Sequence, residues 1–418
     1  MRIQTVLNRL WRLKDFIYGK VEWGEWEGKI CLNVAIRPRR GRLPVCSGCG
    51  ERGPVYDHLG QRRLRFVALW SFAMYFLYSM RRVHCPTCGV KVERVEWTEG
   101  KHSLTVALQW HLATWAKRLS WKGVADAFDV RWHHVYSSVS MAVAWGRAHV
   151  DLNGITAIGV DELHTGDGQR GYVTLVYQID KFRRRLLWIG REHKAKTLRA
   201  FFEWFGSDLS GRLEFVCSDM WKPYLKVIAQ KASQALHILD RFHIVGQLNK
   251  AVDAVRRQEV GVLKRRGEEH VLAKSRWCFL KKPSNLTERQ KPRLRELLRL
   301  NLRTVRAYLL KEDFQFFWTY VSATWAGKFL DRWCHGAMRS RLEPMKRVAR
   351  MVRGHRELML NWFRARKEIS SGVVEGLNNK ARVGTRQAYG FHTYHCLEMA
   401  LYHRLGDLPE PEIAHRFS

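Results

Sequence analysis

The stretch 157-AIGVDELHTGDGQRGYVTLVYQID-180 decides the fold, because it places two apolar runs on either side of a glycine-rich turn. Short apolar runs bounded by turn residues are typical of buried β-strands. The first run ends at two adjacent acids, Asp161 and Glu162. An ionised carboxylate beside a buried strand costs free energy unless it has partners. Asp161 is therefore a candidate functional residue if the rest of the chain supplies those partners.

Three later segments continue the pattern of strands and helices. RRLLWIG reads as a third strand, and a helix is expected after it. LEFVCSDMWKPY then gives a fourth short strand that ends at Asp219, and QALHILDRFHI gives a fifth that ends at Asp240. Three strands, a helix, a strand and a helix form the element order of an RNase H-like sheet, whose first and fourth strands are neighbours. Asp161 and Asp219 are therefore expected to converge.

A third acid follows much later, in SGVVEGLNNKARVGTRQAYGF, where Glu375 lies in an expected helix. Three converging carboxylates would bind two Mg²⁺ (or Mn²⁺) ions about 3.5–4 Å apart, because these cations prefer oxygen ligands. Taken singly, each acid is equally typical of a helix N-cap or a solvated loop. Asp240 reads first as such a cap. Glu162 should face away from Asp161, because adjacent residues of a strand point to opposite faces.

The cysteines are partly clustered. The pairs Cys46/Cys49 and Cys85/Cys88 form two CxxC motifs, each followed at once by a glycine. Paired motifs of this kind predict a tetrahedral Zn²⁺ site held by four thiolates, and the glycines allow backbone amides to turn toward sulfur. The alternative is two unrelated pairs of buried cysteines. Such a zinc site is structural and does not by itself specify a function.

A helix-turn-helix is expected in LSWKGVADAFDVRWHHVYSSVSMAVAWG (119–146). Ala125 permits close approach of a second helix, Asp129 occupies the turn, and Val135 follows ten residues after Ala125. Glycine is commoner at the turn, although Asp tolerates a left-handed backbone. The second helix would present five side chains to DNA: Arg131, His133, His134, Tyr136 and Ser137. The alternative is a helix pair that contacts no DNA.

The charge balance points to a polyanionic partner. Lys and Arg number 73 against 39 Asp and Glu, which gives a formal net charge of +34 and a pI near 10.2. No targeting segment is evident, and the uncharged run Phe66–Met80 is shorter than the ~20 residues that span a bilayer as a helix. We expect this run to form a pair of strands. The predicted location is cytoplasmic and nucleoid-associated, with no membrane partner.

These patterns predict a multidomain α/β protein. It consists of an N-terminal zinc-binding β module, a helix-turn-helix domain, and an RNase H-like α/β catalytic core interrupted by an all-α insertion. The expected ranges are 1–98 (zinc module), 99–150 (helix-turn-helix), 151–258 (first part of the core), 259–365 (insertion) and 366–418 (last part of the core and tail).

The chain resembles bacterial insertion-sequence DDE transposases of the ISL-three group. The resemblance covers nearly the whole sequence and depends on the two cysteine pairs, the helix-turn-helix, and the motifs IGVDE, SDMWKPY, DRFHI and EGLNNKAR…QAYGF. It implies that Asp161, Asp219 and Glu375 form the catalytic triad. The long separation of Asp219 from Glu375 implies a helical insertion between them.

The expected function is a DNA transposase. It would bind the terminal inverted repeats of its element, free a 3′ hydroxyl by hydrolysis and transfer it to target DNA, as a homodimer or higher oligomer on double-stranded DNA. Lys380, Arg382 and Arg386 are candidates for contacting phosphates, or they belong to a solvated basic helix. Trp221 could stack on a flipped base, but core packing is the better interpretation. The alternatives are a non-catalytic DNA-binding regulator and an RNase H-like structure-specific nuclease.

Overall fold

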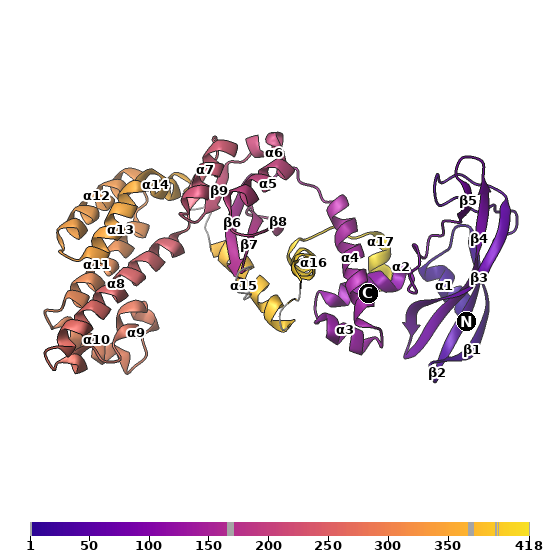
Figure 1. Ribbon diagram of the computed structural model, residues 1–418, viewed down its shortest axis with the longest axis horizontal. Helices are drawn as coiled ribbons and strands as arrows, with labels where there is room; N and C mark the ends of the chain where they lie inside the picture. Colours follow the sequence, from indigo (N-terminus) through magenta and orange to yellow (C-terminus); the bar gives the residue numbers. More distant parts are fainter. Residues whose placement is uncertain (1, 165–170, 367–371, 389–390, 392, 418) are drawn as a thin grey trace. The chain divides into compact units, whose positions relative to one another are not determined.

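The computed structural model describes residues 2–164, 171–366, 372–388, 391 and 393–417. The chain divides into two compact units. Unit 1 comprises Met1–Asp151 and Val383–Ser418, and unit 2 comprises Leu152–Arg382. The coarse prediction of a mixed α/β protein is confirmed, because each unit contains one five-stranded sheet together with helices (Figure 1).

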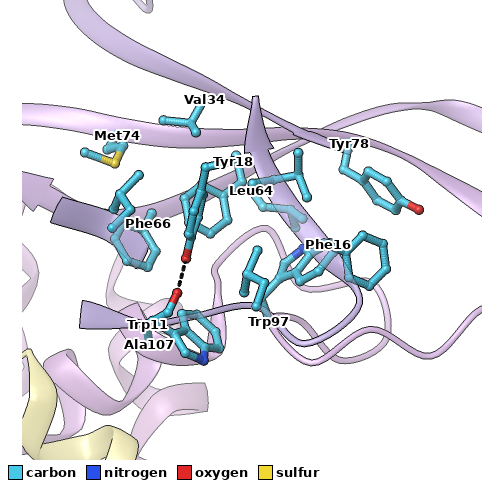
Figure 2. Packing of buried hydrophobic residues seen from close by; sticks show 14 of the residues in the cluster. Trp11, Phe16, Tyr18, Val34, Leu64, Phe66, Met74, Tyr78, Trp97 and Ala107 are labelled. Atoms are coloured by element: carbon cyan, nitrogen blue, oxygen red, sulfur yellow. Dashed lines mark hydrogen bonds between the residues drawn. The ribbon is translucent and has the colours of Figure 1, made fainter. Parts of the chain in front are cut away.

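The N-terminal sheet of unit 1 encloses an aromatic core. Its strands run in the order β1-β2-β4-β3, and β5 pairs with β4. Rings from several strands pack together with Trp97 and with Ala107, and the Tyr18 hydroxyl donates a hydrogen bond to the Trp11 carbonyl oxygen at 2.6 Å (Figure 2). The elements are α1 (Ile3–Leu10), β1 (Phe16–Trp26), β2 (Lys29–Pro38), β3 (Val55–Leu69), β4 (Phe72–Cys85) and β5 (Gly89–Val92).

The uncharged run Phe66–Met80 forms the end of β3 and the start of β4, as predicted. Its apolar residues alternate between the two faces of the sheet, and Phe66, Met74, Phe76 and Met80 enter the core. No helix in the described part of the chain is both long and apolar enough to cross a membrane.

The predicted helix pair lies where the sequence placed it. α2 (Val106–Ala116) and α3 (Trp121–Ala127) both pack on α4 (Trp132–Ala148). Asp129 in the turn has φ of 50°, the left-handed conformation that the sequence required there. Its carboxylate accepts a hydrogen bond from Lys29 at 2.7 Å, which ties the turn to strand β2. Val135, Val139 and Val143 are buried between the helices.

The C-terminal segment packs with these helices. α16 (Tyr394–Leu405) contacts α4, and α17 (Glu412–Arg416) contacts α2. The sequence had placed residues 366–418 with the catalytic core, whereas Val383–Ser418 belongs to unit 1. The reason is local: Ala414 joins Trp110, Ala113 and Ala142 in one apolar cluster, so this segment buries its apolar side chains among the helices of unit 1.

The sheet of unit 2 has the strand order β10-β9-β6-β7-β8. β6 pairs antiparallel with β7 and parallel with β9, so the first and fourth strands of this sheet are neighbours, as predicted. β7 is buried along nearly its whole length, because helices cover both of its faces. The strands are β6 (Ala157–His164), β7 (Tyr172–Ile179), β8 (Arg184–Arg191), β9 (Phe215–Ser218) and β10 (Leu236–Leu239).

Different helices cover the two faces of β6. Ile158 and Val160 join the apolar cluster that also holds Phe201 and Val227 from α5 (Ala195–Phe205) and α7 (Lys222–Lys231). α6 (Ser207–Gly211) follows α5. On the opposite face, Gly159 leaves room for Val374 of α15 (Gly372–Gln387). α15 therefore lies directly on β6.

The expected all-α insertion is helical throughout. Between Arg241 and Arg366 the structure describes only helices and turns (Figure 1). The boundary expected at residue 259 falls inside a helix. This helix begins directly after β10, so the helical region starts at Arg241. The helices are α8 (Arg241–Lys264), α9 (Arg276–Leu280), α10 (Gln290–Leu298), α11 (Arg303–Gln315), α12 (Ala323–Arg339), α13 (Glu343–Gly354) and α14 (Arg356–Arg364), with short 3₁₀ turns at Glu269–Leu272, Pro283–Asn285 and Phe316–Thr319.

Gly159→Val should destabilise unit 2. A side chain at this position would collide with Val374 and Ile179, and overpacking of this kind costs about 1–3 kcal/mol. Thermal unfolding should show a lower midpoint for this variant. Gly246→Ala is the control, because Gly246 lies in α8 with no atom near its would-be side chain. That change should raise the stability slightly. Equal or greater stability of Gly159→Val would contradict the docking of α15 on β6.

Candidate active site

Asp161 and Asp219 occupy equivalent positions on neighbouring strands. Gly159 of β6 pairs with Cys217 of β9 in parallel register, and each acid follows its paired residue by two positions. Side chains at the carboxyl ends of adjacent parallel strands meet at one edge of the sheet. The structure therefore brings these two predicted acids to the same edge.

Asp161 is largely buried and is held by helix α15. Its Oδ1 accepts a hydrogen bond from the Glu162 amide at 2.8 Å, and its Oδ2 accepts one from Asn378 Nδ2 at 2.5 Å. Asn378 is itself 1% exposed, and its Oδ1 accepts a hydrogen bond from the Tyr177 hydroxyl at 2.7 Å. Burial, with smaller contributions from the nearby acids Asp240 and Glu162, raises the pKa of Asp161 to about 6.

Asp219 belongs to a second group of side chains. One ligand atom from each of Glu162, His193 and Asp219 lies within 4.8 Å of the other two. A Glu162 carboxylate oxygen lies 2.8 Å from His193 Nε2, and this contact lowers the pKa of Glu162. Burial raises the pKa of Asp219. Glu162 thus lies on the opposite face of β6 from Asp161, as the sequence predicted.

Glu375 is exposed in the first turn of α15 and lies outside that group. It precedes Asn378 by three residues, and residues at this spacing are neighbours on one side of a helix. Asn378 is the residue that joins α15 to Asp161. The third predicted acid is therefore on the helix that contacts the first one, about one turn away from that contact.

The carboxylates at this edge of the sheet fit a divalent cation. Burial raises the pKa of both Asp161 and Asp219, and the negative charge of Glu162 raises both further, so several acids at this place oppose one another's ionisation. A bound cation would remove that opposition, and Mg²⁺ and Mn²⁺ prefer such oxygen ligands. Among the described residues at this edge, the side chains whose ligand atoms lie close enough together to hold one cation are Glu162, His193 and Asp219.

The four predicted zinc ligands come together. The sulfurs of Cys46, Cys49, Cys85 and Cys88 all lie within 4.8 Å of one another. Four sulfurs around a tetrahedral zinc would be about 3.8 Å apart, given a Zn–S distance of about 2.3 Å. The glycines after the two motifs, Gly50 and Gly89, have φ of 79° and 71°, the left-handed conformation that glycine adopts most readily.

The titration of these thiols also fits a cation. Backbone amides of Cys49 and Gly48 lower the pKa of Cys46 to about 7, whereas its hydrogen bond with Cys49 raises the pKa of Cys88 to about 12. One thiol therefore loses its proton readily, and the negative charge of that thiolate opposes deprotonation of the neighbouring thiols. A divalent cation supplies the charge that four adjacent thiolates need.

The five side chains expected to contact DNA from α4 differ in their exposure. Arg131 and His133 are exposed. The other three make contacts within unit 1: His134 with Ser103 at 3.2 Å, Ser137 with the His134 carbonyl oxygen at 3.0 Å, and Tyr136 by stacking on the Trp132 ring. On α15, the basic residues Lys380, Arg382 and Arg386 are all exposed.

Asp240 and Trp221, whose roles the sequence left undecided, both make structural contacts. Asp240 caps α8, because its carboxylate accepts a hydrogen bond from the Phe242 amide at 2.7 Å. Trp221 is partly buried and packs against His193 and Tyr224. Sequence reasoning missed His193, which gave no pattern, and Asn378. The spacing of Asn378 from Glu375 was the one signal that could have indicated it.

Two named transposases are similar to the chain over most of its length. The transposase for insertion sequence element IS1001 from Bordetella parapertussis is 28% identical over 375 residues, which cover 89% of this chain and 91% of that protein. The transposase for IS1557 from Mycobacterium tuberculosis (strain H37Rv) is 28% identical over 385 residues, which cover 86% and 85%.

A family model described as a transposase, and named for the DDE transposases of the ISL3 group, matches residues 158–401. This match covers more than half of the chain. It contains the sheet of unit 2, the helical region and α15. The chain therefore belongs to the ISL3 family of DDE transposases, and its function is that of a DNA transposase.

Proposed function

We propose that the chain binds the terminal inverted repeats of its element, hydrolyses a phosphodiester at each end, and transfers the freed 3′ hydroxyl to target DNA. The catalytic core is RNase H-like. The observation that supports this proposal most strongly is the adjacency of Asp161 and Asp219 on neighbouring parallel strands, with α15 docked beside them. Asp161, Asp219 and Glu375 form the catalytic triad.

The triad would hold two Mg²⁺ (or Mn²⁺) ions, which supply a stabilised hydroxyl nucleophile and neutralise the leaving 3′ oxygen. Neighbouring groups of the chain hold the aspartate side chains in place. Asn378 holds the Asp161 carboxylate, and the Trp221 amide donates to Asp219 at 3.1 Å. Glu375, exposed in the first turn of α15, would be the third carboxylate that holds the ions.

DNA recognition is assigned to the N-terminal modules and the basic surface. Zn²⁺ on the four cysteines would hold together the loop of residues 46–49 and the β4–β5 turn. Arg131 and His133 are the α4 side chains that would contact DNA, and Lys380, Arg382 and Arg386 would contact phosphates near the cleaved bond. Double-stranded DNA, bound by a homodimer or higher oligomer on the nucleoid in the cytoplasm, is the proposed partner.

The rival functions fit the chain less well. A regulator without catalysis would have no use for two partly buried acids of raised pKa at adjacent strand ends. A structure-specific nuclease of the RNase H type would have little use for a four-cysteine module and a helix-turn-helix.

Asp161→Asn should abolish cleavage while leaving DNA binding intact. The change keeps the shape of the side chain and removes the charge that would bind metal, so cleavage should fall by several orders of magnitude. Asp219→Asn and Glu375→Gln should behave alike, and combining them should add little, because residues that act as one unit are not additive. The measurement is Mg²⁺-dependent cleavage of a labelled terminal-repeat duplex.

Asp240→Asn is the matched control for these variants, because an asparagine also caps a helix. It should retain cleavage. Binding by every variant should weaken steeply with salt, as counterion release requires. If Asp161→Asn cuts as well as the parent while Glu162→Gln is inactive, the metal is held by the Glu162 side of the strand and the triad is misassigned.

Asn378→Ala should reduce cleavage by about a hundredfold, because misplacement of a catalytic group by about 1 Å has that effect. The variant loses both hydrogen bonds that join α15 to Asp161 and Tyr177. Tyr177→Phe removes only one of them and should have a smaller effect. Asn379→Ala is the control, since Asn379 is exposed and bonds only Arg382 among its described contacts. Equal single-turnover rates for Asn378→Ala and Asn379→Ala would contradict the positioning role.

Purified protein should contain about one Zn²⁺ per chain. Cys46→Ser should release it and weaken terminal-repeat binding, while the circular dichroism of the helical part stays near that of the parent. Cys31→Ala is the control, because Cys31 is as buried as Cys46 and also belongs to unit 1 but lies outside the cluster. It should retain zinc. Elemental analysis that finds no zinc in reduced parent protein would disprove the site.

A further inference from the structure

A basic cavity lies between α8 and α9, in the helical region of unit 2. Its volume is about 560 Å³, within the range of about 300–1,000 Å³ typical of small-ligand sites. α8 contributes Asn249, Lys250, Asp253, Arg256 and Arg257, which recur at the spacing of one helix face. α9 contributes Arg276, Trp277 and Leu280. Four cations and one acid therefore line the cavity.

Asp253 arranges the guanidinium groups of this cavity. Its carboxylate bonds Arg256 at 2.8 and 2.9 Å and also approaches Arg257 at 3.5 Å and Arg276 at 3.7 Å. The side chains of Asp253 and Arg256 are 13% and 16% exposed, whereas those of Arg257 and Arg276 are 69% and 54% exposed. One acid cannot neutralise three guanidinium groups, so the two exposed ones keep donors for an external anion.

The cavity also offers a flat aromatic surface and a free polar atom. Trp277 is 52% exposed, and the Arg276 guanidinium lies 5.1 Å from the centre of its ring. Asn249 Oδ1 is enclosed but accepts no hydrogen bond from the residues that the structure describes. An enclosed amide without a partner costs free energy until a ligand supplies one.

We propose that this cavity binds one unpaired nucleotide of a DNA strand. The phosphate would lie on Arg257 and Arg276, the base would stack on the exposed face of Trp277, and the Asn249 amide would bond an edge of the base. This proposal rests on the proposed function only in naming DNA as the ligand.

The chemistry favours an unpaired nucleotide over a duplex. Phosphates alone would need only the guanidinium groups, and a duplex keeps both faces of each internal base stacked, so Trp277 would have nothing to contact. Base–aromatic stacking beside a basic groove is the arrangement by which proteins bind single strands. The net positive lining excludes cationic ligands.

The test compares two labelled duplexes of equal length, one blunt and one with a short unpaired tail, bound to full-length protein without divalent metal. Trp277→Ala should weaken binding of the tailed duplex about tenfold, the effect of losing one stacked base. It should change binding of the blunt duplex less than twofold. Trp277→Phe keeps an aromatic face and should bind nearly as the parent does. Arg257→Ala with Arg276→Ala should also weaken the tailed duplex preferentially.

Trp325→Ala is the matched control. Trp325 lies in the same helical region, is 60% exposed and has Lys328 Nζ 4.4 Å from its ring, but it is outside the cavity. It should leave both affinities unchanged. Equal loss with Trp325→Ala, or equal loss for blunt and tailed duplexes with Trp277→Ala, would overturn the proposal. A parent that prefers the tailed duplex through Trp277 yet never cuts DNA with Mg²⁺ would disprove the proposed catalysis and leave this site standing.

Discussion

The hydrogen bond from Asn378 to Asp161 is the contact on which the proposed active site depends. It joins α15 to the first strand of the sheet although the two residues are far apart in sequence. Its geometry requires Gly159, whose missing side chain admits Val374, and Tyr177, which fixes the other end of the Asn378 amide. Together these three contacts hold α15, which carries Glu375, against the sheet of unit 2.

The alternation of side chains along β6 separates two chemical environments. Asp161 faces α15, whereas Glu162 faces His193 and Asp219. Asp219 follows the end of its strand and lies with Glu162 and His193. This arrangement leaves two ways to surround a cation: with Asp161 and Glu375 on the side of α15, or with Glu162 and His193 on the other. Mg²⁺ prefers oxygen ligands alone, which favours the side of α15.

Much of this architecture could be predicted from the sequence, because the periodicity of apolar residues and the acids at strand ends are local signals. The strands themselves, the turn at Asp129, the cysteine cluster and the helical insertion followed from such signals, and the element order predicted that the first and fourth strands are neighbours. The assignment of residues 383–418 did not, because the partners of Ala414 are distant in sequence. His193 was missed for the same reason, because its contacts with Glu162 and Asp219 are tertiary. Asn378 was also missed, although its spacing from Glu375 places it on the same side of the helix.

The most direct test of the central claim is the position of manganese in a crystal of the protein bound to terminal-repeat DNA, located by the anomalous scattering of Mn²⁺. The account predicts Mn²⁺ bound by Asp161 and Asp219, with Glu375 as a further ligand and Asn378 still bonded to Asp161. Manganese held by Glu162, His193 and Asp219, with Asp161 and Glu375 unligated, would contradict it.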